Sequence, residues 1–246
     1  MYAIFTFHSI DDKGSVISYS LRHFALLLEV LAERNIPVFD LDTLLAPGTR
    51  HGVALTFDDG MRSVYRAALP VLREHGAPAH LFLTTGAVDS ATPWPRDAVD
   101  GHTFEMLNWD EIGELHAAGV AIECHTRTHP DMRTLSVAQM QEECEQADEL
   151  IGQRLGRRPG YFAYPYGYHN RQVRDFARQR YRGTVTTELR PLGAHRDSAA
   201  LPRLDAFYLQ SERLIQAIDS VRLKSYLAAR NILRNVKGSQ CRADCA

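Results

Sequence analysis

The chain has 246 residues, of which 45% are hydrophobic and 24% charged, and its formal net charge is −2. This composition is typical of a folded domain, and the near-neutral charge provides no basic field, so nucleic-acid binding is disfavoured. No part of the sequence approaches the roughly 20 consecutive apolar residues that a membrane span needs.

The first predicted strand covers residues 2–7, and His8 stands directly at its end. Polar residues at positions 8 and 11–13 interrupt the apolar start, so the pattern of a signal peptide is absent and we expect a cytoplasmic protein. The four cysteines agree with this compartment. Cys124 and Cys144 are expected to be packed thiols, whereas Cys241 and Cys245 could pair or bind metal, although incidental cysteines are commoner near a terminus.

A second apolar run, residues 53–55, leads into Thr56-Phe57-Asp58-Asp59-Gly60. It predicts a buried strand that brings two adjacent carboxylates to its C-terminal edge and turns at the glycine. One Asp could then hold a cation while the other stays free for proton transfer. Alone, Asp-Asp-Gly is weak evidence, because most such tripeptides are solvated turns.

Strand and helix signals alternate along the rest of the chain. Helical spacing or caps occur at 24–31, 65–75, 108–116, 136–155, after 170 and at 211–236, and strand signals at 80–83, 120–124, 183–186 and 201–205. The inner face of the long fourth helix is predicted to consist of Val137, Met140, Cys144, Ala147, Ile151 and Leu155. The alternation predicts parallel strands with helices outside, in one domain over residues 1–236 with a flexible tail at 237–246.

One long connection interrupts this alternation. Residues 87–103 show no clear period, and a loop of this length in a compact domain is usually functional. Trp94 within it is a candidate sugar-stacking residue, because the apolar face of a pyranose fits a flat aromatic ring. The alternative is a tryptophan that pins the loop to the domain.

The predicted strand at 120–124 runs directly into His125-Thr126-Arg127-Thr128-His129. Two imidazoles four residues apart can converge on one cation, and Asp59 would complete a set of two nitrogens and one oxygen. Such a set leaves positions open for water and substrate. A His pair that only hydrogen-bonds its loop is the alternative, but the Asp-Asp-Gly strand end in the same chain favours a metal site.

A third motif is Tyr161-Phe162-Ala163-Tyr164-Pro165-Tyr166-Gly167, a short apolar run that ends in a Pro-Tyr-Gly turn. In this chain order the three motifs resemble those of the NodB-homology polysaccharide deacetylases, carbohydrate esterases that remove N- or O-acyl groups from sugars. The family pattern is T-F-D-D-G, H-[ST]-x-x-H and R-x-P-Y-G, and here the third is matched only in its second half. The resemblance implies an α/β fold, a distorted (β/α) barrel of about seven parallel strands.

The resemblance also implies a role for each matched residue. Asp58 corresponds to the general base, and Asp59, His125 and His129 to the ligands of a divalent cation. Pro165 and Tyr166 fall at the substrate-binding turn, where the Tyr166 N–H would help to hold the oxyanion, and Thr126 fills the Ser/Thr position. Ligand type favours zinc, with cobalt, nickel, iron or manganese as alternatives.

Two features depart from the family pattern. The motif arginine, which braces the base, falls on Ala163, and Arg203 is the candidate to reach Asp58 in its place; a surface arginine is the alternative. The Leu-x-His motif that supplies the general acid is missing near the C-terminus. Some relatives, including exopolysaccharide deacetylases, are circularly permuted so that this strand opens the chain, which nominates His8 as the acid, with His195 as a competitor.

The predicted function is metal-dependent hydrolysis of an N-acyl group, N-acetyl by preference, on a sugar or polysaccharide. Three alternatives stay open: a hydrolase of a non-sugar amide, a deformylase of a lipid-linked sugar, and a catalytically silent sugar-binding barrel. The sequence leaves the sugar, the metal and the oligomeric state undetermined.

Overall fold

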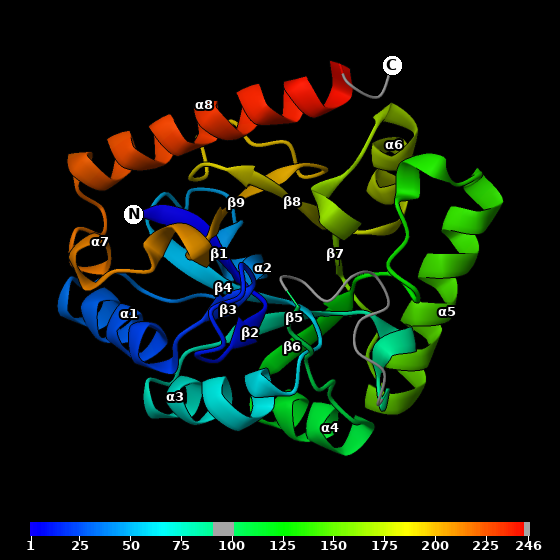
Figure 1. Cartoon of the computed structure of the whole chain (residues 1–246). Coiled ribbons are helices and arrows are strands. Elements are labelled where there is room, and N and C mark those ends of the chain that lie inside the picture. Colours follow the sequence, from blue (N-terminus) through cyan, green and yellow to red (C-terminus); the bar gives the residue numbers. More distant parts are fainter. Residues whose placement is uncertain (91–100, 244–246) are drawn as a thin grey trace.

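The computed structural model describes residues 1–90 and 101–243, with side chains up to residue 234. Seven strands form a closed barrel in the order β1-β4-β5-β6-β7-β8-β9, and all their pairings are parallel (Figure 1). They are β1 (Tyr2–Phe7), β4 (Gly52–Asp59), β5 (Ala79–Leu83), β6 (Val120–Cys124), β7 (Tyr161–Ala163), β8 (Gly183–Leu189) and β9 (Leu201–Asp205). The predicted α/β barrel is therefore confirmed.

Helices surround the barrel, as the alternating pattern predicted. They are α1 (Leu21–Glu33), α2 (Leu41–Leu44), α3 (Leu69–Glu74), α4 (Trp109–Ala117), α5 (Val137–Leu155), α6 (Arg171–Arg180), α7 (Glu212–Gln216) and α8 (Val221–Ala243). A π-helical turn at Val64–Ala68 precedes α3, and a separate small sheet of β2 (Ser9–Ile10) and β3 (Ser18–Tyr19) follows β1. None of the described helices is long and apolar enough to cross a bilayer.

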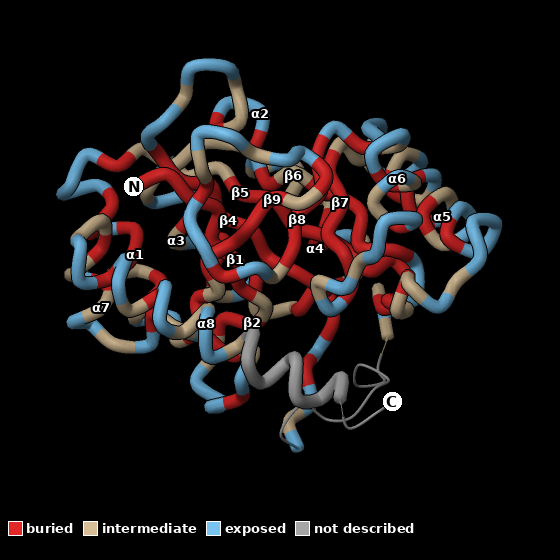
Figure 2. The backbone as a smooth tube through the Cα atoms, turned by 90° about the horizontal axis from the view of Figure 1, so that it is seen from above, coloured by how far each residue is buried: buried red, intermediate tan, exposed pale blue. Residues whose placement is uncertain are grey.

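The side chains of β1 separate the two hydrophobic layers. Ala3, Phe5 and Phe7 join the cluster that includes α1, whereas Tyr2 and Ile4 join a smaller cluster with residues of β4, β5 and β7. Because alternate residues of a strand point to opposite sides, the smaller cluster fills the barrel and the larger one packs the helices against it. Figure 2 shows the strands almost entirely buried within more exposed connections.

Local sequence signals account for most helix ends. Asn108 and Ser136 each form a capping box at the start of α4 and α5, and Asn170 caps α6. Gly156 ends α5 in the left-handed conformation.

Two details of the sequence prediction are wrong. The predicted helix at 211–236 is two helices, α7 and α8, since Asp219 between them has a φ of 62°. Val137, predicted to face the core, is 48% exposed at the first position of α5, where the neighbouring chain does not cover it. α8 continues to Ala243, beyond the predicted boundary at 236, and the flexibility of the tail stays a prediction.

Candidate active site

Two carboxylates lie at the C-terminal end of β4, where the sequence predicted them. Asp58 and Asp59 are both buried, and Asp59 has a left-handed backbone with a φ of 73°. Adjacent residues of a regular strand face opposite sides. The left-handed residue breaks this alternation at the strand end, which lets the two carboxylates serve one site.

The two histidines stand in a loop whose backbone is held by Thr126. The Thr126 hydroxyl accepts a hydrogen bond from the His129 N–H at 2.9 Å, and both residues have a positive φ. His125 Nδ1 lies 2.8 Å from the carbonyl oxygen of Ala163, which can only accept, so Nδ1 carries a proton. In the neutral ring Nε2 is then an acceptor, and it points toward Asp59.

Asp59, His125 and His129 form a compact, buried group. The Nε2 atoms of His125 and His129 lie 3.4 and 3.6 Å from Asp59 Oδ1, and one ligand atom from each residue falls within 4.8 Å of the others. Ligand atoms at about 2.0–2.2 Å from one tetrahedral cation are about 3.3–3.6 Å apart. The residues therefore fit a divalent cation of the size and preference of zinc.

The protonation of this group also suits a cation. Burial opposes ionisation of Asp59, but the hydrogen bond from His125 and nearby positive charges hold its pKa well below the usual range. Burial and the charge of His125 lower the pKa of His129 to about 3. Burial would also lower the pKa of His125, but its hydrogen bond to Asp59 and the charges of both carboxylates raise it. Cation binding therefore requires His125 to lose a proton.

Asp58 is paired with an arginine from the other end of the sequence. Arg203 of β9 is 1% exposed and donates to both Asp58 carboxylate oxygens, at 2.7 and 2.6 Å. It also donates to the Thr56 hydroxyl at 3.1 Å and to the Thr186 carbonyl at 2.9 Å. Burial would raise the pKa of Asp58, but the charge and hydrogen bonds of Arg203 lower it. The predicted contact is present, and it favours the ionised form of Asp58.

The two nominated acids lie at different places. β1 and β4 pair with Phe7 opposite Phe57, so His8 follows β1 beside Asp58, and its charge acts on Asp58 and Asp59. His195 is exposed in the connection from β8 to β9. In that connection the Leu192 N–H donates to the Tyr2 carbonyl, at the opposite end of β1. The structure brings His8, and not His195, to the carboxylates.

The Pro-Tyr-Gly turn approaches the cluster from β7. Pro165 is buried, and Tyr166 has a left-handed backbone with its ring centroid 4.4 Å from that of His129. Trp94 lies outside the described residues. Thr186 and the Ala163 carbonyl were missed by the sequence analysis, because both act through backbone oxygens that carry no side-chain signal.

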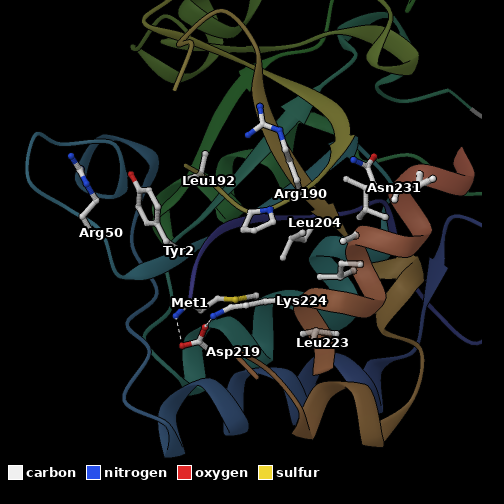
Figure 3. Close-up of a pocket in the computed structure, with 15 residues that line it drawn as sticks. Met1, Tyr2, Arg50, Arg190, Leu192, Leu204, Asp219, Leu223, Lys224 and Asn231 are labelled. Atoms are coloured by element: carbon white, nitrogen blue, oxygen red, sulfur yellow. Dashed lines mark ion pairs between the residues drawn. The ribbon is translucent and has the colours of Figure 1, made fainter. Parts of the chain in front are cut away.

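A cavity of about 550 Å³ lies elsewhere, between α8 and the start of β1 (Figure 3). Met1, Leu204, Leu223 and Lys224 contribute to its walls, and Asp219 pairs there with Lys224 and the Met1 amino group. None of the predicted site residues that the structure describes lines it, so it is separate from the cluster at the opposite end of β1.

Comparison with known proteins identifies relatives of the barrel. The family described as polysaccharide deacetylase matches residues 46–181, more than half of the chain. The chain is 29% identical over 141 residues to the chitin deacetylase of Colletotrichum lindemuthianum, covering 55% of this chain and 49% of that protein. It is 27% identical over 132 residues to the poly-beta-1,6-N-acetyl-D-glucosamine N-deacetylase of Staphylococcus aureus, covering 49% of this chain and 42% of that protein. The chain thus spans about half the length of these relatives.

A solved structure extends the likeness to nearly the whole fold. IcaB from Ammonifex degensii has a TM-score of 0.70 and 24% sequence identity, covering 87% of this chain and 97% of that one.

Proposed function

Because the chain belongs to the polysaccharide deacetylase family, we propose that it hydrolyses an N-acetyl group on an oligosaccharide or polysaccharide. The observation that carries this proposal is the buried Asp59–His125–His129 cluster next to a carboxylate, Asp58, that accepts two hydrogen bonds from Arg203. The printed names of the relatives, deacetylases of chitin and of poly-N-acetylglucosamine, support the substrate class.

Asp59, His125 and His129 would hold the cation, and their donor set favours zinc. When bound there, a divalent cation would make a neighbouring water more acidic and polarise the acyl carbonyl. Asp59 supplies a negative charge, and the two imidazoles supply neutral nitrogens once His125 has lost its proton. The Ala163 carbonyl orients His125 by holding the proton on Nδ1.

The remaining residues would move the protons. Asp58, ionised through Arg203, accepts a proton from the attacking water. The backbone N–H of Tyr166 stabilises the oxyanion of the tetrahedral species. His8, directly after the strand that pairs with β4, donates a proton to the departing nitrogen, which is a poor leaving group unless it is protonated.

The first experiment measures acetate release by the zinc-reconstituted protein from N-acetylglucosamine and its β-1,4 and β-1,6 oligomers. We expect Asp58→Asn to lose at least about 100-fold in kcat with its metal content unchanged, because the amide cannot accept the proton of the water and Asp58 is not one of the three metal ligands. His8→Ala should lose activity on amides more than on aryl esters, whose leaving group needs no proton. His195→Ala is the matched histidine control and should retain activity.

The outcomes separate the proposal from its rivals. Unchanged activity in Asp58→Asn would overturn the assignment of the base. A wild-type protein that binds metal but releases no acetate from any sugar would favour a non-sugar amide, a formyl group on a lipid-linked sugar, or a binding role.

A further inference from the structure

A row of π-systems leads outward from the candidate metal cluster. The Tyr166 ring lies edge-to-face with His129, and the Tyr168 ring follows with its centroid 5.6 Å from that of Tyr166 at an interplanar angle of 36°. The Arg133 guanidinium then covers the Tyr168 ring at 4.1 Å from its centroid. These groups connect the buried cluster to the surface without interruption.

Both tyrosine rings are exposed to solvent. Tyr166 is 37% and Tyr168 46% exposed, and Phe207 is the one other exposed aromatic residue among those the structure describes. Two adjacent rings on the rim of a candidate site are unusual, because large aromatic side chains are normally buried. Adjacent exposed apolar surfaces indicate a binding site for a ligand with an apolar face.

Arg133 is fixed in place rather than free to move. Its guanidinium makes a bidentate pair with Asp131, with Nε and the terminal nitrogen donating at 2.9 and 2.6 Å. Asp131 in turn caps the short 3-10 turn at Met132–Thr134 through the Arg133 N–H. The Arg133 guanidinium and the Tyr166 ring both lie against the Tyr168 ring, and 46% of Tyr168 is nevertheless exposed.

This combination suits a sugar ring. A pyranose has apolar C–H faces that pack on an aromatic ring and hydroxyl groups at its edge that accept hydrogen bonds from a guanidinium. A lone acetylated sugar bound at the cluster would reach Tyr166 but has no second ring for Tyr168. A sugar bonded to it can extend along the row.

We propose that Tyr168, supported by Arg133 and Asp131, forms a subsite for the sugar next to the one that loses its acetyl group. This inference rests on the proposed deacetylase function and assigns a residue to the binding of the neighbouring sugar. Tyr168 determines the preference for chain length and takes no part in the chemical step.

The test compares N-acetylglucosamine with its tetramers. Wild-type protein should show a higher kcat/KM on a tetramer, and Tyr168→Ala should lower this value about tenfold, mainly through KM, while activity on the monosaccharide is unchanged. Tyr168→Trp should restore the preference. Arg133→Ala should act in the same direction more weakly. Arg154→Ala is the matched control, because Arg154 stacks on Trp109 between the outer helices α4 and α5.

A binding experiment keeps this inference separate from the proposed function. Calorimetric titration of tetramers into Asp58→Asn should give a dissociation constant about tenfold weaker when Tyr168→Ala is added, whether or not the wild-type protein turns over. Equal affinity with and without Tyr168→Ala, or equal loss of activity on monosaccharide and tetramer, would overturn the subsite. Absence of acetate release alone would overturn the proposed reaction and leave the calorimetric result to decide the subsite.

Discussion

Asp58 is a buried carboxylate whose ionisation depends on one partner. Arg203 meets it with two parallel hydrogen bonds, and two further donors of the guanidinium bond to Thr56 and Thr186. This bidentate pair fixes both the charge and the orientation of the carboxylate. Removal of the arginine alone would leave an uncompensated charge inside the barrel.

We therefore expect Arg203→Met to lower the free energy of unfolding by about 3–5 kcal/mol and to abolish most activity. The double variant Arg203→Met/Asp58→Asn should recover much of the stability but none of the activity, because the buried charge is gone together with the base. Urea denaturation followed by circular dichroism measures the stability of both variants, and acetate release measures their activity. A double variant no more stable than Arg203→Met would contradict this account of the pair.

Asp11 links the two strands of the small β2–β3 sheet, which follows His8. It accepts hydrogen bonds from the Ser9 and Ser18 hydroxyls and from the Lys13 N–H. Burial would raise the pKa of Asp11, but these hydrogen bonds outweigh it and the pKa is lowered. The carboxylate thus contributes stability above its unfolded pKa of about 3.9, and this contribution is lost as pH falls through the lower folded pKa.

The corresponding prediction concerns Asp11→Asn. Its unfolding free energy should be about 1 kcal/mol below wild type at pH 7, and the difference should shrink in acid below about pH 4, where the wild-type carboxylate is protonated as well. Denaturant titrations of both proteins across this range provide the measurement. A difference that grew in acid would have the wrong sign for a lowered pKa.

At the scale of elements, the turn after β7 is more tightly constrained than an ordinary helix end. Gly167 has a φ of 70°, and a Cβ there would overlap the side chain of Thr187 in β8. Gly156 at the end of α5 has a similar φ of 73°, but no atom lies within 4 Å of its Cβ position. The two glycines share a backbone conformation and differ in their surroundings.

This pair gives a controlled prediction. Gly156→Ala should cost about 1 kcal/mol, the price of a left-handed backbone for alanine. Gly167→Ala should cost more and should also reduce deacetylase activity, because relief of the clash must move the neighbouring Tyr166. Thermal denaturation and acetate release compare the two variants. Equal effects would show that β8 does not hold the turn.

Local signals in the sequence predicted the starts of helices better than they predicted how the helices pack. Asn108, Ser136 and Asn170 mark helix starts correctly, since a cap is decided within one helical turn. The break between α7 and α8 was missed, because Asp219 carries no glycine or proline signal for its left-handed backbone. The exposure of Val137 was missed because helical periodicity does not show how far the neighbouring chain covers the helix.

In the candidate site, too, some features could be predicted from the sequence and others could not. The grouping of Asp59, His125 and His129 could be predicted, because parallel strands bring their C-terminal ends to one edge. The row of π-systems that leads outward from the cluster could not be predicted, because Arg133 and Tyr168 meet only after two loops fold together. The pairing of Asp58 with Arg203 was predicted only beside the alternative of a surface arginine, because it depends on closure of the barrel, which no local pattern specifies.

For the molecule as a whole, the proposed cation site would couple cation binding to folding. Its ligands come from β4 and from the loop after β6, so a bound cation would stabilise the folded state and not the separated strands. With free zinc at about 100 times its Kd the stabilisation is about 2.7 kcal/mol, which predicts a Tm about 5–10 °C higher than after chelation. His129→Ala should lose this difference. A Tm unaffected by zinc in the wild type would contradict the proposed ligand set.

The barrel is sealed where the first strand meets the last. β1 aligns with β4 along six residues, but with β9 only at Phe5 and Thr6, opposite Leu204 and Asp205. During synthesis on the ribosome, β1 can pair with β4 early, yet its second edge stays uncovered until β9, about 200 residues after β1, has been made. Arg203 arrives on that same late strand. A nascent chain therefore carries both carboxylates long before it carries the guanidinium that balances Asp58, and the candidate catalytic apparatus is complete only after β9 has been made.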